Sequence, residues 1–286
     1  MHALPTLVAL AAALLLTPPI LRHLQAEGFT RENYRGVRLP FPGGIAIVAA
    51  GVLAVGLWTG FVMIAKLDPF DWGAHLDLVY PLGIALLGLI DDLLAGASRG
   101  WRGHGRALLG GQFSTGALKA IGSLALALYV LVGVAYDEGV GKYLLAVALL
   151  VLTTNLFNLL DLRPGRAAKA FLLLGVLLSL VAWHGRPAFG SLAPLWVFGP
   201  LAAPILVAGY YDLRERTMLG DVGANLIGAV AGLWLISAFG TTGQMIALAV
   251  VLALTVYGEF RSLSALIERT PLLRQIDSIG RNDAHA

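Results

Sequence analysis

Apolar stretches of about 20 residues recur along the whole chain, and a stretch of that length can cross a bilayer as one helix. One of them, "KYLLAVALLVLTT", has no charged residue after Lys142 and runs directly into "NLFNLLD". Because hydrocarbon offers no hydrogen-bond partners, a backbone that crosses it must pair its own polar groups, as a helix or a closed barrel. The length of these stretches favours helices, and so predicts an all-α polytopic membrane protein.

The composition agrees with this fold class, since 58% of the 286 residues are hydrophobic and only 13% are charged. Soluble domains carry about 25% charged residues, roughly twice that fraction. There is no cysteine, which excludes disulfides, thiolate chemistry and cysteine-type zinc sites. We interpret the pI of about 9.3 as a sign of basic loops at a membrane surface, not of nucleic-acid binding.

We expect the first apolar segment to be a retained helix, because it lacks the basic leader and small-residue cleavage site of a signal peptide. There is no internal repeat of the transporter kind, so residues 1–286 are predicted to form a single membrane domain, with 267–286 as a cytoplasmic tail. The last span is expected to be broken or followed by a short helix. About nine spans of this length are predicted, near 3–21, 43–65, 77–95, 117–136, 143–161, 168–185, 192–210, 220–239 and 244–266.

The distribution of Lys and Arg predicts the orientation. The chain has 20 of these residues, and only Lys66, Lys142 and Arg186 fall in one of the two alternating sets of connections. Since cytoplasmic loops carry the excess of basic residues, the other set is cytoplasmic, which places the N-terminus outside and the C-terminus inside a multi-pass protein of the cell membrane. That basic set includes Arg38, Arg99, Arg102, Arg106 and Lys119.

Polar side chains gather at the predicted cytoplasmic ends of four spans. A charged side chain at mid-bilayer costs about 2.5–3.5 kcal/mol on insertion scales, so such residues are functional candidates. One Asn alone is more often a helix cap or an interhelical contact, and a pair of Asp residues is often a solvated helix end. Those explanations do not predict four clusters at one membrane face. The clusters are Asp91 and Asp92; Asn155, Asn158 and Asp161; Asp221 and Asn225; and Glu259 and Arg261.

These residue types point to phosphate chemistry with Mg²⁺. Asn155, Asn158 and Asp161 are three apart and share one helix face. Hard cations such as Mg²⁺ take oxygen ligands, usually one or two carboxylates together with substrate phosphates. Basic loop residues would neutralise phosphate oxygens, and "GDVGAN" opens a helix whose free N–H groups can face a phosphate. The carboxylates available for the cation are Asp91, Asp92, Asp161 and Asp221.

The ordered set resembles the polyprenyl-phosphate N-acetylhexosamine-1-phosphate transferases, a membrane family within glycosyltransferase family 4. "PFPGGIAIV" is similar to the Pro-x-Gly-Gly segment of the family, and "GLIDD" to its Asp-Asp motif. Lys119 in "STGALKAIG" resembles the basic residue that opens the following span. "NLFNLLD" is similar to the N-x-x-N-x-x-D motif, and "GDVGANLIG" to G-D-x-G-S. The resemblance covers roughly residues 29–235, with the motifs in the family's order.

The family implies transfer of a sugar 1-phosphate from a UDP-sugar to a polyprenyl phosphate such as undecaprenyl phosphate, with Mg²⁺ and release of UMP. This reaction serves cell-envelope glycan synthesis, including that of peptidoglycan. The resemblance makes Asp221 the principal Mg²⁺ ligand and places Asp91 and Asp92 beside the lipid phosphate, with Asp92 a second candidate ligand. The resemblance also assigns the remaining motif residues to substrate binding. A homodimer is possible on the same ground. The expected substrate-binding residues are Lys119, Asn155, Asn158, Asp161, Asn225 and, from the first loop, Arg38.

Two departures keep other hypotheses open. The family motif continues D-G-x-D-G, whereas "DLRPG" has Leu162 and Pro164 in place of the glycine and the second carboxylate. The family's His-rich loop motif has no counterpart, since the tail holds only His285. A second hypothesis is therefore a catalytically altered or inactive member that binds lipid phosphate, nucleotide or a partner protein. A transporter or channel is a third, but it would need polar residues in the outer halves of the spans, which are nearly all Ala, Val, Leu and Gly.

Overall fold

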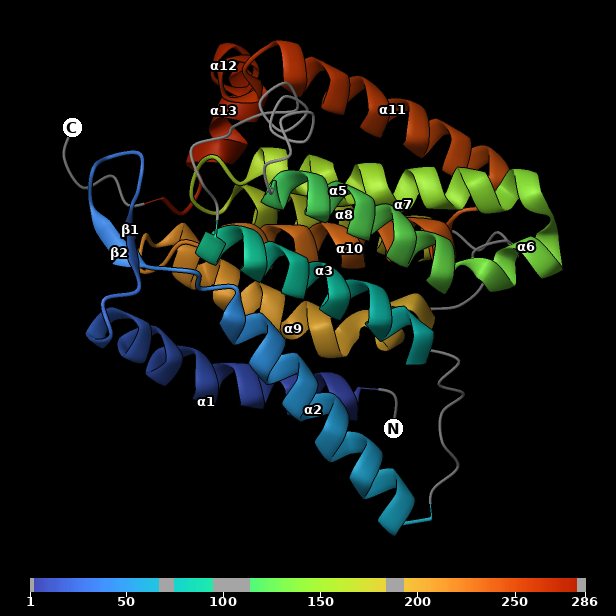
Figure 1. The fold of residues 1–286 in the computed structure, drawn as a ribbon, viewed down its shortest axis with the longest axis horizontal. Coiled ribbons are helices and arrows are strands. Elements are labelled where there is room, and N and C mark those ends of the chain that lie inside the picture. Colours follow the sequence, from blue (N-terminus) through green and yellow to red (C-terminus); the bar gives the residue numbers. More distant parts are fainter. Residues whose placement is uncertain (1–2, 67–74, 95–113, 184–192, 282–286) are drawn as a thin grey trace.

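A computed structural model describes residues 3–66, 75–94, 114–183 and 193–281. The stretch 95–113, with Arg99, Arg102 and Arg106, lies outside the described residues, as do Arg186 and His285. The described residues form helices and one two-stranded hairpin (Figure 1). The elements are α1 (Leu4–Ala26), β1 (Thr30–Glu32), β2 (Arg38–Pro40), α2 (Ile45–Ile64), α3 (His75–Leu94), α5 (Thr115–Val130), α6 (Val132–Glu138), α7 (Val140–Leu160), α8 (Arg166–Trp183), α9 (Ala193–Leu213), α10 (Gly220–Ala238), α11 (Thr241–Phe260), α12 (Leu263–Arg269) and α13 (Pro271–Ser278).

Each predicted span coincides with a helix, and two of them differ in detail. The range 117–136 is divided into α5 and α6 at Leu131. The range 244–266 is broken after Phe260, as expected for the last span, because the backbone there is extended and the Ser262 hydroxyl accepts the N–H of Ala265 to cap α12. Among the described residues, α1, α2, α7, α10 and α11 are long and apolar enough to cross a membrane. These helices indicate a membrane protein, while the number of crossings and the orientation remain predictions.

Helix α10 forms the centre of the bundle, and every residue from Val222 to Leu235 is buried. It packs along α3 and α7, while α1 and α2 lie on one side of the bundle and α11 on the other (Figure 1). Its first turn touches the start of α2, where a Cβ added to Gly44 would lie 2.3 Å from the backbone nitrogen of Gly223. Only glycine permits this approach, so "PFPGG" fixes where α10 begins.

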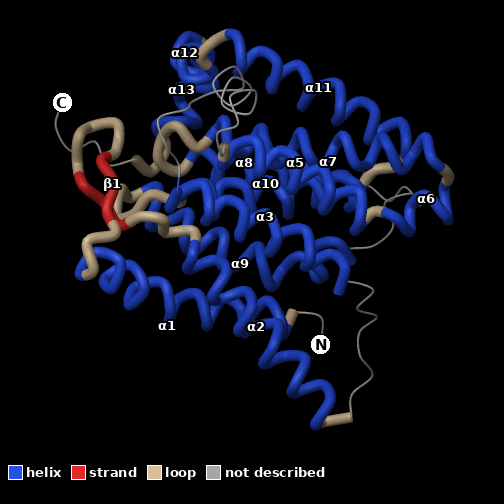
Figure 2. The backbone as a smooth tube through the Cα atoms, in the orientation of Figure 1, coloured by secondary structure: helices blue, strands red, loops and turns tan. Residues whose placement is uncertain are grey.

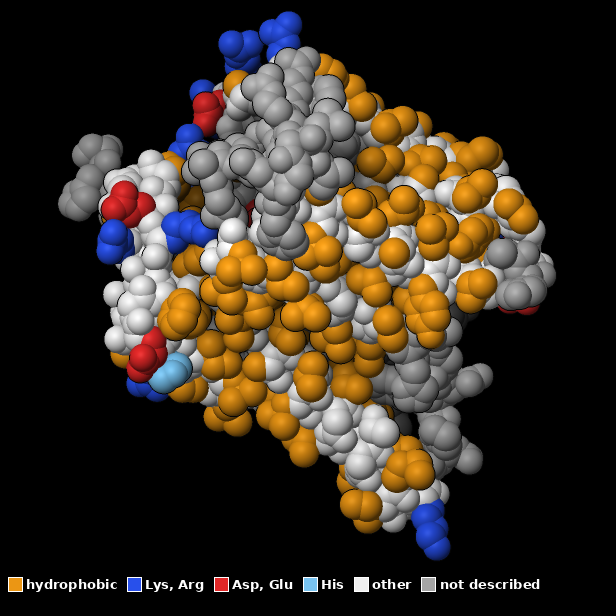
Figure 3. Space-filling model, in the orientation of Figure 1, with side chains coloured by type: hydrophobic (Ala, Val, Ile, Leu, Met, Phe, Trp, Pro, Cys, Tyr) orange, Lys and Arg blue, Asp and Glu red, His pale blue; other side chains and the backbone are white. Residues whose placement is uncertain are grey.

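The bundle has a polar end, which we call the hairpin end, where β1, β2, α12 and α13 lie together (Figure 2). Strands β1 and β2 are antiparallel, with Arg31 opposite Leu39. Charged side chains gather at this end in Figure 3, while hydrophobic side chains cover the middle of the same face. An apolar band beside a charged end is the surface expected of a helix bundle in a bilayer.

Candidate functional site

Three helices bring Lys119, Asp91 and Asp221 into contact at the hairpin end. The Lys119 ammonium, near the start of α5, donates to Asp91 Oδ2 in α3 over 3.1 Å. It also donates to Asp221 Oδ2 in the first turn of α10. The three side chains are 17–27% exposed, so they are neither solvated surface groups nor sealed in the core. Among the described residues, no group of three or more Asp, Glu or His side chains is arranged to hold a metal ion.

The side chain of Asp92 has different partners from that of its neighbour Asp91. Its Oδ1 accepts the N–H of Asp221 and its Oδ2 accepts the N–H of Val222, each over 3.0 Å. Asp92 is 8% exposed, and its carboxylate therefore caps the start of α10 from a neighbouring helix. A helix N-terminus has unpaired N–H groups and a partial positive charge, and a carboxylate satisfies both. Asp92 thus determines where Asp221 lies relative to Lys119.

Arg31 joins this site, although the sequence analysis did not select it. Its guanidinium lies 3.7 Å from the centre of the Phe41 ring and donates to the backbone carbonyl of Asp92 over 3.2 Å. Arg38, which was expected to bind substrate, is 72% exposed and pairs with Glu32 across the hairpin over 3.4 Å. The two arginines lie in the same loop sequence, and only the hairpin shows which one reaches α3.

Further carboxylates lie close to this cluster. Asp161 ends α7, and Asp212 in the last turn of α9 is 3% exposed and accepts the N–H of Gly165 over 2.6 Å. Asp161 lies close enough to Asp212, Asp221 and Asp92 for their negative charges to repel one another. A bound cation would relieve this repulsion. Asp212 was missed by the sequence analysis because "YYDLRER" resembles an ordinary solvated helix end.

The three asparagines predicted to bind substrate lie on α7 and α10, which pack closely against each other. Asn155 and Asn158 are half-buried in the last turns of α7. Asn225 lies one turn after Asp221, is 2% exposed, and its amide nitrogen has no hydrogen-bond partner among the described residues. Buried polar groups are normally paired, so this amide is available to hydrogen-bond a ligand.

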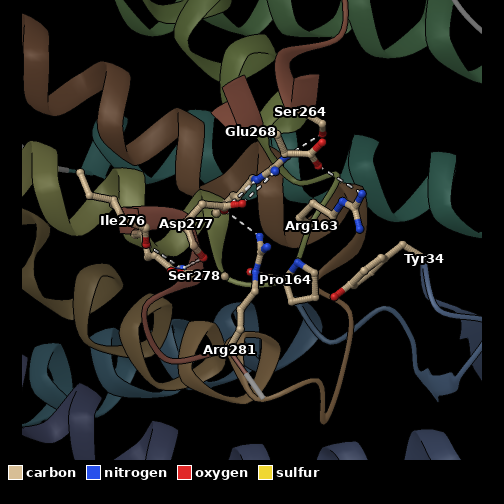
Figure 4. A network of polar contacts seen from close by, with 12 residues as sticks. Tyr34, Arg163, Pro164, Ser264, Glu268, Ile276, Asp277, Ser278 and Arg281 are labelled. Atoms are coloured by element: carbon tan, nitrogen blue, oxygen red, sulfur yellow. Dashed lines mark hydrogen bonds and ion pairs between the residues drawn. The ribbon is translucent and has the colours of Figure 1, made fainter. Parts of the chain in front are cut away.

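The turn after Asp161 is attached to the C-terminal segment 270–281 (Figure 4). Arg166 is 5% exposed and binds both carboxylate oxygens of Asp277 over 2.9 Å, with a third bond of 2.6 Å to the Ser264 hydroxyl. Arg281 donates to the other end of the network, to Asp277 over 2.7 Å and to the Pro164 carbonyl over 3.4 Å. Arg166, the second arginine of "RPGR", therefore binds a segment more than 100 residues away in sequence.

We expect the contact between Arg166 and Asp277 to persist at mildly acidic pH. Burial alone would raise the pKa of Asp277, but hydrogen bonds from Arg166 and the charges of Arg166, Arg281 and Lys169 hold it below its usual value. A carboxyl with a lowered native pKa stabilises the fold above its unfolded pKa of about 3.9, and that contribution is lost only as pH falls through the native value.

Hydrogen exchange of α13, corrected for the intrinsic effect of pH, should therefore show the same protection at pH 5 as at pH 7. Loss of protection between these two values would contradict the lowered pKa of Asp277.

No protein-family model matches the chain. The chain is similar to a protein of Moorella thermoacetica named phospho-N-acetylmuramoyl-pentapeptide-transferase. The two are 29% identical over 240 residues, which cover 80% of this chain and 73% of that protein. This similarity supports the family resemblance of the motifs at low identity, and the aligned share is large enough to include most of the helix bundle.

Proposed function

We propose that the chain transfers a sugar 1-phosphate, of the N-acetylhexosamine type, from a UDP-sugar to a polyprenyl phosphate and releases UMP. The observation that carries the proposal is the convergence of Lys119, Asp91 and Asp221 from three helices at one polar end of an apolar bundle. The similarity to a transferase of phospho-sugars supports the same reaction class. We place the reaction at the cytoplasmic face of the cell membrane, in cell-envelope glycan synthesis.

The reaction takes one substrate from the lipid and the other, a nucleotide sugar, from water, which explains why the site lies at the end of the bundle. An oxygen of the lipid phosphate attacks the phosphorus that carries the sugar, and the bond from that phosphorus to the UMP oxygen breaks. Such phosphoryl transfer depends on alignment and charge neutralisation. Lys119 would neutralise phosphate oxygens, Asp91 would face the attacking lipid phosphate, and Asp92 would hold Asp221 at the start of α10.

The donor atoms of this site fit Mg²⁺. Asp91 and Asp221 already converge on one cation, the Lys119 ammonium, and both offer the hard oxygen ligands that Mg²⁺ takes together with substrate phosphates. These two residues would hold the ion, which would neutralise the negative charge of the diphosphate. Asp92 was expected as a ligand from the sequence, but we assign it to positioning because both its oxygens accept backbone N–H groups.

The pocket for the UDP-sugar would lie between α7 and α10. Asn155, Asn158 and Asp161 form the α7 side, and Asn225 contributes from α10. The proposed donors are UDP-sugars with an N-acetylhexosamine group, because the related transferase is named for a phospho-N-acetylmuramoyl group. The pentapeptide in that name is a feature of the relative's substrate and is treated as one arm of the test.

The proposal is tested by UMP release from a panel of UDP-sugars, with undecaprenyl phosphate and Mg²⁺ in detergent. The panel includes UDP-N-acetylglucosamine and UDP-N-acetylmuramoyl-pentapeptide. We expect UMP formation with at least one donor, abolished when either the lipid or Mg²⁺ is omitted. Folded protein that releases no UMP with any donor would overturn the proposal. Binding of a uridine nucleotide in that case would favour the inactive member that Pro164 and the missing His-rich motif left open.

A further inference from the structure

The turn between α7 and α8 carries Asp161 and is held from two sides. On the inner side, the Asp212 carboxylate accepts the N–H of Gly165 over 2.6 Å. Gly165 has a φ of +76°, and an added Cβ would lie 2.5 Å from a methyl group of Leu213, so the turn is closely packed on α9. On the outer side, every polar contact described for the Arg166 side chain is made with α12 or α13.

The outer contacts are buried and charged, unlike an ordinary surface ion pair. The side chains of Arg166 and Asp277 are 5% and 9% exposed, and two parallel hydrogen bonds of 2.9 Å join them. Bidentate Arg–carboxylate pairs fix orientation as well as distance. Lys169 donates to the backbone carbonyls of Ile276 and Asp277 at the end of α13, where a helix favours a cation. The C-terminal segment is therefore fixed in angle and in register on the turn (Figure 4).

The sequence places this attachment within a few residues of the candidate site. Arg166 follows Asp161 by five positions, and five of the six residues 161–166 have polar partners. These are Asp161 with the Asn158 carbonyl, Arg163 with Glu268, Pro164 with Arg281, Gly165 with Asp212, and Arg166 with Asp277. Loss of the outer attachment would leave the turn held by Asp212 on one side, and Asp161 would gain freedom.

We propose that the C-terminal segment 270–281 is part of the donor side of the site, with Asp277 as a positioning residue that acts through Arg166 on the turn that carries Asp161. This inference rests on the proposed function. Asp277 does not contact Lys119, Asp91 or Asp221 in the contacts described, so the phosphoryl-transfer cluster should be unaffected by its loss. Binding of the UDP-sugar should be weakened, since Asp161 belongs to the nucleotide pocket.

Helix α12, which precedes the C-terminal segment, offers a matched control in Glu268, which pairs with Arg163 of the same turn. That pair is separated by 3.5 Å, and its side chains are 30% and 55% exposed. Exposed pairs of this kind contribute little. Glu268→Gln and Asp277→Asn each remove one negative charge that faces the turn between α7 and α8, but only the second removes a buried attachment.

The first experiment compares steady-state kinetics of the parent protein, Asp277→Asn, Arg166→Lys, the double variant and Glu268→Gln. For Asp277→Asn we expect the KM for the UDP-sugar to rise about tenfold, with kcat and the KM for the lipid within about threefold of the parent; a tenfold change is about 1.4 kcal/mol. The double variant should be no worse than the poorer single variant, because both remove one contact. Glu268→Gln should match the parent.

The second experiment measures the attachment itself and needs no substrate. The chain has no cysteine, so Leu162→Cys with Ile279→Cys gives one spin-label pair, at positions 59% and 65% exposed. The distance distribution should be narrow in this pair and broaden when Asp277→Asn is added, but not when Glu268→Gln is added. Broadening with an unchanged KM would overturn the positioning role, and an unchanged distribution would overturn the attachment. A parent protein with a narrow distribution but no UMP release would instead overturn the proposed function.

Discussion

Asp221→Asn should lower the rate of UMP release by about 100- to 1,000-fold, the loss typical when one electrostatic contact to the reacting centre is removed. The substitution keeps the size of the side chain and removes the charge that faces Lys119. It leaves the backbone N–H of residue 221 on the Asp92 carboxylate, so the start of α10 should be unchanged. The loss should appear in kcat, because the interaction acts on charge in the transferred group.

The measurement is UMP release at saturating Mg²⁺ and lipid, together with the thermal midpoint of the purified protein. Asp137→Asn is the matched control, because Asp137 is an exposed carboxylate on α6, whereas Asp221 lies at the hairpin end. The control should keep the parent rate. If Asp221→Asn also kept it, neither a role in metal binding nor one in charge neutralisation could be assigned to Asp221.

The helices could be predicted from the sequence because the bilayer sets their length, and apolar runs report that length directly. The break at Leu131 could not, since it lies within a continuous apolar range and depends on local backbone geometry, whereas a break in the last span was expected from the sequence. The exclusion of cysteine chemistry follows from composition alone, whereas the place of α10 at the centre of the bundle is revealed only by packing.

All carboxylates near the site except Asp212 could be predicted as a group, because they share one end of several helices. Their partners could not be, since pairing between helices has no local pattern. Lys119 lies 102 residues from Asp221, and Arg166 lies 111 residues from Asp277. Arg31 and Arg38 are equally plausible in the first loop until the register of the hairpin selects Arg31 for α3.

Asp91 and Asp92 are adjacent in sequence, yet they have different partners in the structure, so we expect their substitutions to have different effects. Asp91→Asn should lower the rate of UMP release at least tenfold with little change in thermal stability, because Asp91 is paired with the flexible Lys119 side chain. Asp92→Asn should lower both the rate and the stability. Its amide has one acceptor oxygen, so the N–H of Asp221 or of Val222 would lose its partner, at a cost of about 1–3 kcal/mol for a buried donor.

The two variants remove the same charge from neighbouring positions, so each is the control for the other. Thermal unfolding in detergent and UMP release are measured on the same preparations. A stable Asp92→Asn protein with a strongly reduced rate would assign Asp92 to the chemistry or to the metal ion, as the sequence led us to expect. A destabilised protein would support the capping role, because a substitution that acts only on bound substrate or metal cannot unpair the first turn of α10 in the free protein.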